Sequence, residues 1–274
     1  MVINLNGVNY YYEIAGKGEP LMLLHGFTGD VSTWKLSRLS DSFKVITIDI
    51  IGHGKSDAPA DPNRYTMEAV AKDLCDMLNI LGINRIHLLG YSMGGRLALS
   101  FTMFYPERVK TLILESSSPG IKTEEERKNR IRQDEHLANT ILEDGIEHFV
   151  NYWENIPLFK SQTQLPEQVQ KSIRKQRLKN SPLGLANSLR GMGTGRQPSW
   201  WDRLQKCELP VLLLTGELDQ KFCQIAKEME ADLPNCQRIV FPNVGHAVHL
   251  EDPVSFEQSI LRFLSNRVPN THFI

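Results

Sequence analysis

One pentapeptide, Gly90-x-Ser92-x-Gly94, constrains the fold of this chain more than any other feature. The apolar run 86–89 before it predicts a buried strand, and the small and apolar residues after Gly95 predict a helix packed closely against a sheet. At so sharp a turn, a side chain at position 90 or 94 would collide with the crossing strand and helix, and glycine avoids this collision. The pattern predicts a nucleophile elbow that presents the Ser92 hydroxyl at a helix N-terminus, where free N–H groups favour developing negative charge.

Apolar runs like the one before Ser92 recur along the chain, at 21–24, 45–49, 109–114, 211–215 and 238–241. Continuous runs of this kind are typical of strands buried on both faces of a parallel sheet. Apolar residues at helical spacing lie between or after them, at 67–81, 224–233 and 253–264. Residues 2–5 and 10–14 alternate instead, around Asn6-Gly7, which predicts an antiparallel hairpin at the sheet edge. We therefore predict an α/β fold with a mostly parallel, doubly wound sheet.

Residues 120–206 interrupt this alternation. The segment has helical patterns punctuated by Pro157, Pro166, Pro182 and a glycine-rich loop at 191–195, and no convincing strand. We expect a helical cap here, between a first core segment at 1–119 and a second at 207–274, placed over the carboxyl ends of the strands. The cap holds 15 Lys and Arg against 11 Asp and Glu, a net charge near +4, which favours an anionic ligand. Most of these side chains are expected on solvated helix faces.

Composition narrows the classes of protein further. A net charge of −1 gives no reason to expect a nucleic-acid partner. No apolar run is long enough to span a membrane and the first residues lack the features of a signal peptide, so we expect a cytoplasmic protein without a membrane partner, as a monomer or weak homo-oligomer. The four cysteines are scattered, which favours free thiols. No cluster at metal-ligand spacing and no phosphate-cradling glycine loop is present, so we expect no metal and no organic cofactor.

Two later loops supply the acid and the base that a serine nucleophile needs. Asp219 follows the run 211–215, and His246 follows the last run. The chain order Ser92, Asp219, His246 is the order found when acid and base lie on loops after later strands and converge on an elbow. We predict that His246 takes the serine proton and that Asp219 orients the imidazole and stabilises its charged form. Glu217 is an alternative acid, and His249 is an alternative to His246.

The same geometry predicts an oxyanion hole. One donor is the N–H of Met93, and the other is the N–H of Phe27, because Gly26 lets the backbone of that loop approach the site. His25 and His53 lie in loops near the site. We expect hydrogen bonds that hold these loops together rather than a catalytic role.

Five blocks together resemble the α/β-hydrolase superfamily and account for nearly all of the chain outside the insertion. They are 24–27, Asp49 with 52–56, 90–95, 216–219 and 245–246. The resemblance implies the α/β-hydrolase fold, with an N-terminal hairpin and a helical cap. Such a resemblance is specific for the fold and weak for the substrate.

More narrowly, the blocks 90–96, 118–121, 193–198 and 245–249 are similar to the MenH family, the 2-succinyl-6-hydroxy-2,4-cyclohexadiene-1-carboxylate synthases of menaquinone biosynthesis. The resemblance implies a lyase that eliminates pyruvate from a cyclohexene bearing a carboxylate, a succinyl group and an enolpyruvyl ether. The triad then abstracts a ring proton instead of cleaving an ester, and the oxyanion hole receives charge from the succinyl carbonyl.

A substrate with three carboxylates requires cations. Arg96 lies one helical turn beyond Ser92, so its side chain can point to the same side as the nucleophile and bind a carboxylate. The resemblance also implies substrate contacts for Arg130, Trp153 and Arg177. Other candidates are Tyr91, for a hydrogen bond beside the elbow, and Arg132 or Arg174, in place of the two cap arginines.

Two other functions stay open on the sequence alone. A serine esterase or carbon–carbon bond hydrolase of the same fold would use the same triad. A ligand-binding receptor could keep the fold without catalysis, although the complete triad argues against it.

Overall fold

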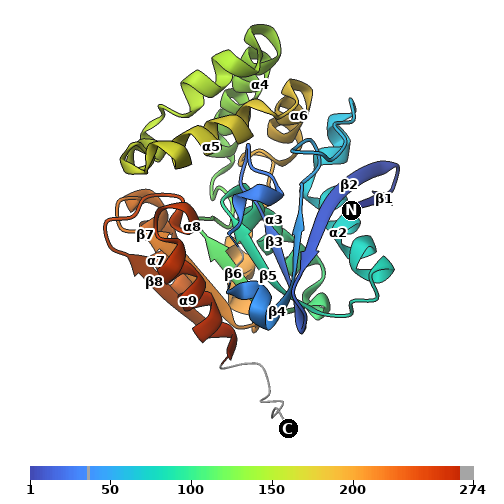
Figure 1. The fold of residues 1–274 in the computed structure, drawn as a ribbon, viewed down its shortest axis with the longest axis vertical. Coiled ribbons are helices and arrows are strands. Elements are labelled where there is room, and N and C mark those ends of the chain that lie inside the picture. The colour runs from blue at the N-terminus through green and yellow to red at the C-terminus, as the bar shows by residue number, and fades with distance from the viewer. Residues whose placement is uncertain (36–37, 266–274) are drawn as a thin grey trace.

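An eight-stranded sheet lies at the centre of the molecule (Figure 1), in the order β1-β2-β4-β3-β5-β6-β7-β8, in a computed structural model that describes residues 1–35 and 38–265. The strands are β1 (Val2–Leu5), β2 (Val8–Ala15), β3 (Glu19–Leu24), β4 (Phe43–Ile48), β5 (Ile86–Tyr91), β6 (Val109–Glu115), β7 (Val211–Gly216) and β8 (Cys236–Phe241). The pairs from β4 through β8 are parallel, which confirms the predicted sheet.

The N-terminal hairpin is also confirmed. β1 pairs with β2 in antiparallel register, with Leu5 opposite Val8. The turn between them is Asn6-Gly7, and both residues have positive φ, at 50° and 84°. Asn and Gly tolerate this conformation better than other residues, which is why the pair closes a hairpin here. β2 then joins the parallel strands by antiparallel pairing with β4.

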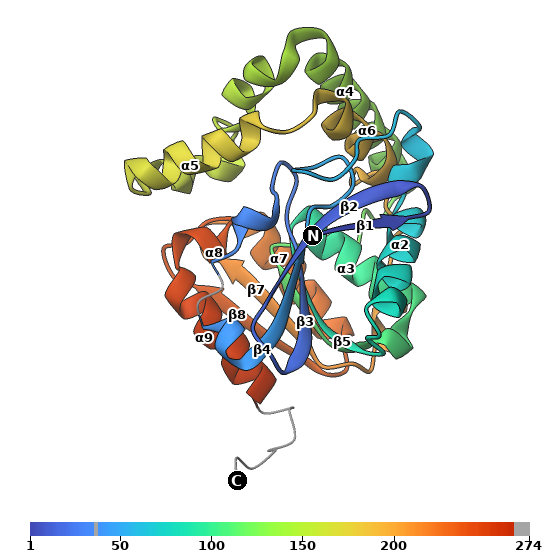
Figure 2. The same cartoon turned by 45° about the vertical axis from the view of Figure 1, so that its right-hand side comes forward.

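Helices cover both faces of the sheet (Figures 1 and 2), and the continuous apolar strands follow from this arrangement. In β3, Leu21 and Leu23 face one core cluster, while Met22 and Leu24 face the other. The helices of the core are α1 (Leu39–Ser42), α2 (Met67–Ile80), α3 (Met93–Phe104), α7 (Gln220–Asp232), α8 (Val248–Glu251) and α9 (Pro253–Ser265). α2 and α3 pack into one cluster and α9 into the other.

The inserted segment between β6 and β7 is helical throughout its described elements and lies over one end of the sheet (Figure 2). Its elements are α4 (Glu124–Trp153), η4 (Pro157–Gln164), α5 (Glu167–Leu178), α6 (Pro182–Met192) and η5 (Trp201–Lys206). It has a small apolar core of its own, which joins α4 to α6 through residues such as Ile141, Phe149 and Leu185. We call residues 120–206 the cap.

Two glycines give the cap a shape that its sequence did not predict. Gly145 has φ of +81° and breaks α4 into two helical parts. Gly191 lies inside α6, which continues to Met192. The predicted start of the loop at 191 is therefore wrong by two residues. A Cβ on Gly191 would lie 2.5 Å from the Cβ of Tyr65, so glycine serves there for close helix packing instead of for a turn.

Within the described residues, no helix is long and apolar enough to cross a membrane. The four cysteines, Cys75, Cys207, Cys223 and Cys236, are all unpaired, as expected from their spacing.

Candidate active site

Ser92 lies at the point where β5 ends and α3 begins, in a strained conformation with φ of +51° and ψ of −108°. A Cβ on Gly90 would approach the carbonyl oxygen of Gly94 to 2.2 Å, and a Cβ on Gly94 would approach that of Leu24 to 2.1 Å. Neither position can hold a larger residue without moving the backbone. The two glycines therefore let strand, turn and helix cross closely enough to expose the serine side chain, as a nucleophile elbow requires.

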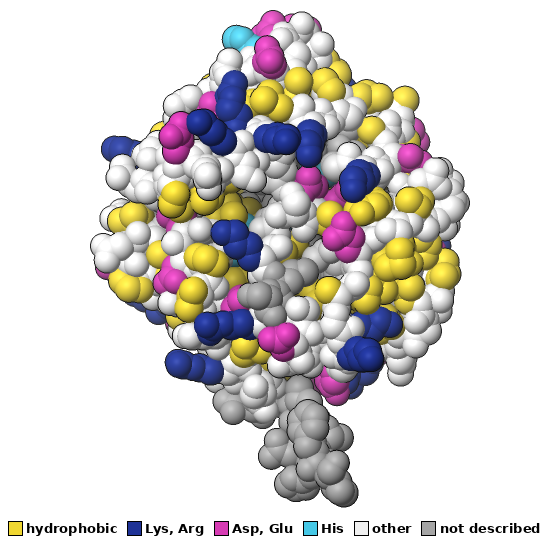
Figure 3. Space-filling view, viewed as in Figure 1, with side chains coloured by type: hydrophobic (Ala, Val, Ile, Leu, Met, Phe, Trp, Pro, Cys, Tyr) yellow, Lys and Arg dark blue, Asp and Glu magenta, His cyan; other side chains and the backbone are white. Residues whose placement is uncertain are grey.

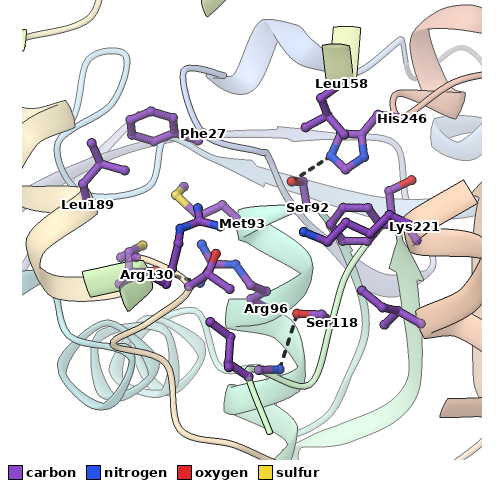
Figure 4. Close-up of a pocket in the computed structure, with 18 of the residues that line it drawn as sticks. Phe27, Ser92, Met93, Arg96, Ser118, Arg130, Leu158, Leu189, Lys221 and His246 are labelled. Atoms are coloured by element: carbon purple, nitrogen blue, oxygen red, sulfur yellow. Dashed lines mark hydrogen bonds between the residues drawn. The ribbon is translucent and has the colours of Figure 1, made fainter. Parts of the chain in front are cut away.

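The structure brings Ser92, His246 and Asp219 together from the ends of three strands. The Nε2 atom of His246 lies 3.0 Å from the Ser92 hydroxyl (Figure 4), and its Nδ1 atom lies 2.6 Å from a carboxylate oxygen of Asp219. Because the carboxylate accepts from Nδ1–H, the Nε2 lone pair faces the serine and accepts its proton. The His246 ring is buried against Phe222, with 4.8 Å between ring centroids. The imidazole is thus held in the orientation that a general base needs.

The two alternative triad residues lie elsewhere. Glu217 accepts a hydrogen bond from the backbone N–H of Asn243, at 3.0 Å, in an exposed position. His249 is buried and its Nδ1 atom lies 2.8 Å from Glu115, while its backbone N–H donates to the same carboxylate. Neither side chain is hydrogen-bonded to Ser92 or His246 in the described structure. The buried Glu115–His249 pair had no signal in the sequence, because its partners are 134 residues apart.

Two backbone N–H groups beside Ser92 are available for an oxyanion. Within residues 1–35 and 38–265, neither the N–H of Phe27 nor that of Met93 donates to a protein acceptor. Met93 is the first residue of α3, where an N–H has no acceptor inside the helix. A Cβ on Gly26 would lie 2.6 Å from the Tyr91 ring, so glycine permits the close approach of the first loop. The arrangement suits the predicted oxyanion hole.

His25 and His53 hold loops, as expected. The Nδ1–H of His25 donates to the carbonyl of Gly26 at 2.8 Å, and its Nε2 accepts from the N–H of Ile50 at 3.0 Å. The Nδ1–H of His53 donates to the carbonyl of Ile51 at 3.1 Å. Burial lowers the pKa of His25 to about 4 and that of His53 to about 3, so both rings are neutral at pH 7.

A cavity of about 650 Å³ lies between the core and the cap, and Ser92 and His246 open into it (Figure 4). Its cap side has an aromatic wall, in which the Trp153 ring lies 5.4 Å from Phe27 and 5.7 Å from Phe159. The Nε1–H of Trp153 is buried and has no acceptor in the described structure, which leaves a donor beside the cavity. Tyr91 lines the cavity as well; burial, with the charge of Glu115 next, raises its pKa well above the ordinary value.

Arg96 lines this cavity without an acidic partner among the described residues. Its Nη1 donates to the carbonyl of Met192 at 2.7 Å and to the amide oxygen of Gln197 at 3.4 Å. Burial lowers its pKa to about 10, the nearby charge of Arg130 contributes, and the carboxylate of Asp134, which is not bonded to it, acts in the opposite direction. The guanidinium therefore stays charged at neutral pH while its bonded partners are neutral. A positive group in this state favours an anionic ligand.

The cap arginines differ from one another. Arg130 lines the cavity and also forms an ion pair with Asp134, at 2.8 Å. Arg177 is buried outside the cavity lining, where its guanidinium lies 4.9 Å from the centre of the Phe159 ring and donates to Gln162. Burial lowers the pKa of Arg177. Arg177 therefore lies behind the described lining, with its guanidinium against the Phe159 ring and its charge acting on Tyr91, which lines the cavity.

The two substitutes that we weighed for the cap arginines do not line the cavity either. Arg174 is paired with Glu154 and donates to Asn151 on the cap surface. Arg132 is an exposed residue of α4. Figure 3 shows several Lys and Arg side chains on one face of the cap. Most Lys and Arg residues of the cap are exposed, so most of its positive charge is solvated.

Sequence reasoning missed several charged residues that line the cavity. They are Lys122, Glu126, Lys221 and Glu228. Lys221 was missed because we placed the start of its helix at 224, whereas α7 begins at Gln220. Asp219 could have indicated the correct start, because aspartate is a preferred N-cap residue and its carboxylate here accepts from the N–H of Phe222. Within the described residues, no group of three or more His, Cys, Asp or Glu could hold a metal ion.

The fold and the elbow define the class of protein. The family model described as alpha/beta hydrolase fold matches residues 19–253, so the chain is an α/β hydrolase by family. A Bacillus subtilis protein provisionally named 2-succinyl-6-hydroxy-2,4-cyclohexadiene-1-carboxylate synthase is 47% identical over 93% of this chain and 95% of that protein. Within the α/β hydrolases, the chain therefore belongs to the family of these synthases.

Solved structures agree with this assignment. The structure of MenH from S. aureus has a TM-score of 0.90 and 40% identity, covering 94% of this chain and 98% of that chain. A thermophilic esterase from Thermogutta terrifontis, solved with malate bound, has a TM-score of 0.85 and 30% identity, covering 97% and 98%. The same fold thus serves a synthase and an esterase, so the site itself must distinguish the two activities.

Proposed function

We propose that this chain eliminates pyruvate from 2-succinyl-5-enolpyruvyl-6-hydroxy-3-cyclohexene-1-carboxylate, giving 2-succinyl-6-hydroxy-2,4-cyclohexadiene-1-carboxylate in menaquinone biosynthesis. Membership in the synthase family supports the reaction. The observation that carries it within the site is Arg96, a buried guanidinium with neutral partners one helical turn from Ser92. A neutral ester would leave this guanidinium with neutral hydrogen-bond partners alone, whereas a carboxylate would give it a charge-assisted, bidentate contact.

The chemistry follows from the hydrogen-bonded triad. His246 takes the proton of Ser92, and the activated serine oxygen removes a proton from the ring of the substrate. Asp219 stabilises the imidazolium that forms. The electron pair of the broken C–H bond moves toward the succinyl carbonyl, where the N–H groups of Phe27 and Met93 receive the developing charge. The electron pair then returns to form one ring double bond, the existing ring double bond shifts by one position, and the C–O bond to enolpyruvate breaks. His246 gives the proton that it took from Ser92 to the leaving enolpyruvate, which becomes pyruvate, while Ser92 keeps the ring proton and no water is consumed.

The remaining cavity residues bind and enclose the substrate in this proposal. Arg96 and Arg130 bind carboxylates, and Tyr91 and Trp153 supply hydrogen-bond donors beside the elbow. Arg177 acts indirectly, by fixing Phe159 in the cavity wall. The malate in the Thermogutta terrifontis esterase supports a small anionic ligand, because malate is a dicarboxylate.

We further propose a cytoplasmic enzyme, monomeric or weakly oligomeric, whose partner is its small-molecule substrate. The four unpaired thiols support a reducing compartment. In this proposal the cap at 120–206 forms one unit, inserted between the two segments of the core at 1–119 and 207–274. Neither a metal nor an organic cofactor is needed, since base, proton carrier and oxyanion donors come from the chain itself.

Pyruvate release tests the proposed function directly. The purified protein is mixed with the enolpyruvyl substrate, and pyruvate is followed by NADH oxidation in a lactate dehydrogenase couple. We expect release that depends on Ser92. A panel of short-chain nitrophenyl esters serves as the comparison, because an ordinary esterase would give a burst as acyl-enzyme accumulates. A strong ester burst without pyruvate release would contradict the proposal and favour the esterase.

A further inference from the structure

The charged residues that line the cavity fall into two groups, according to whether an opposite charge neutralises them. Arg130 is paired with Asp134, and the ammonium of Lys122 is paired with Glu228 at 2.6 Å. In each pair a carboxylate already offsets part of the positive charge, so the attraction to an anionic ligand is weaker than for an unpaired cation. Arg96 is different, because its partners are neutral.

Lys221 is the second cation that the lining leaves without an opposite charge. Among the described residues, its ammonium forms no ion pair and no hydrogen bond that the structure shows. Its closest aromatic contact is with the ring of Phe222, 5.7 Å from the ring centre. Figure 4 shows its side chain extending from the start of α7, and it lines the same cavity as Ser92 and His246. Lys221 therefore has a charge that is free to meet a ligand next to the reacting groups.

The backbone that carries Lys221 is held in place by the triad. Asp219 accepts from the N–H of Phe222 while its other oxygen holds His246, and the Phe222 ring packs on His246 at 4.8 Å. The first turn of α7 thus cannot move without disturbing the catalytic residues. The side chain of Lys221 is flexible, but its point of attachment is fixed relative to Ser92.

We propose that Lys221 binds a second carboxylate of the substrate, distinct from the one held by Arg96. This inference rests on the proposed function, because it concerns the same anionic substrate. The three carboxylates of the substrate lie on different substituents of one ring and repel each other, so one cation cannot hold them all. Arg96 belongs to α3 and Lys221 to α7, so the two charges enter the cavity from two walls on the core side. A molecule with separated carboxylates can contact both, whereas a monocarboxylate cannot.

The kinetic test compares Lys221→Met with Lys227→Met. Both lysines are exposed residues of the same helix, but only Lys221 lines the cavity, so Lys227→Met removes the same charge from the same element away from the site. We expect Lys221→Met to lower kcat/KM for pyruvate release about 10- to 100-fold, mostly through KM, because a contact to a charged group is lost from bound substrate. Lys227→Met should stay within about twofold, because Lys227 is exposed and does not line the cavity. Lys221→Arg should recover most of the loss.

A binding test works without turnover. Calorimetry measures the affinity of propane-1,2,3-tricarboxylate and of butyrate for the wild type and both variants. We expect Lys221→Met to weaken the tricarboxylate about tenfold and butyrate much less, since only the former reaches both cations. Thermal melting of each variant controls for unfolding. Absence of tricarboxylate binding to the wild type, or equal weakening of both ligands, would overturn the inference.

The two tests separate failure of this inference from failure of the proposed function. A wild type that releases pyruvate, with Lys221→Met equal to Lys227→Met, would overturn the role of Lys221 and leave the elimination intact. A wild type that binds the tricarboxylate through Lys221 and releases no pyruvate would contradict the elimination and keep the anion site.

Discussion

The cavity has a core wall, which carries Ser92 and His246, and a cap wall, which carries Arg130 and Trp153, and the two walls hold their side chains in different ways. On the core wall, Ser92, Asp219 and His246 follow strands β5, β7 and β8 and meet within hydrogen-bond distance. On the cap wall, Arg130 lines the cavity and is already paired, whereas Arg177 lies outside the lining.

The difference lies in what fixes each wall. Parallel pairing aligns the strands in register, so residues that follow strand ends must gather at one edge of the sheet. The cap has no such ladder. Its helices are placed by local events, such as the break at Gly145 and the close approach of Gly191 to Tyr65. The strand order of the sheet therefore determines where the catalytic residues of the core wall lie. Helix packing determines where the side chains of the cap wall lie.

The largest effects should come from the core wall. We expect Ser92→Ala and His246→Ala each to lower kcat/KM for pyruvate release by roughly 10³- to 10⁶-fold, since each removes part of the unit that carries the proton. Melting temperatures should change little, because both groups face a cavity. His148→Ala, at an exposed cap position, is the control. If either triad variant kept an activity within tenfold of wild type, the proposed catalytic role of the triad would be contradicted.

The acid offers a sharper test of the same wall. Asp219→Asn should cost roughly 10³- to 10⁴-fold in kcat, because the amide favours the wrong imidazole tautomer. Glu217→Gln should cost less than about threefold, since Glu217 bonds only to a surface loop. Steady-state rates of the two variants decide between them. If Glu217→Gln proved the more damaging, the acid would have to be reassigned.

Much of the core could be predicted because a few local signals determine it. Apolar runs gave every parallel strand, and the Asn6-Gly7 turn gave the hairpin. Asp219 and His246 followed from chain order and from their places after strands.

Other features needed the structure because they depend on distant contacts. Arg177 and an arginine of the cavity lining have the same sequence pattern, and their different places depend on contacts such as those of Arg177 with Phe159 and Gln162. The Glu115–His249 pair joins residues 134 positions apart. The place of Lys221 in the first turn of α7 could have been predicted from Asp219 as the N-cap residue. It was not, because the predicted helix began at residue 224.

Substitution of Arg96 should have an effect smaller than that of the triad variants and larger than that of the cap variants. It tests whether the core wall also binds the charged groups of the substrate. Arg96→Ala removes a charge-assisted contact worth about 2 to 4 kcal/mol in the transition state, or roughly 30- to 1,000-fold in kcat/KM for the anionic substrate. Lysine should restore only part of the loss, because a point charge cannot reproduce the guanidinium fork. A neutral nitrophenyl ester should be affected little, so the ratio of the two losses is the measurement. Equal losses would mean that Arg96 only supports the elbow through Met192.

The smallest effects should come from the cap wall, and they test whether its two arginines really differ. Arg130→Met should lower kcat/KM for the anionic substrate about 5- to 30-fold and spare a neutral ester, because its charge borders the cavity.

Arg177→Met keeps the apolar stem and removes the guanidinium that lies over Phe159 and donates to Gln162. We expect a loss of about 1 to 2 kcal/mol in stability, seen as a lower melting temperature, from the cation–π contact and the buried hydrogen bond. Its kcat/KM should fall only about two- to fivefold, and equally for anionic and neutral substrates, since a displaced Phe159 ring changes the cavity shape and not its charge. A loss confined to the anionic substrate, with unchanged melting, would mean that the cap moves Arg177 into the cavity when substrate binds. The cap wall would then recognise charge through an arrangement of helices that differs from the one described here.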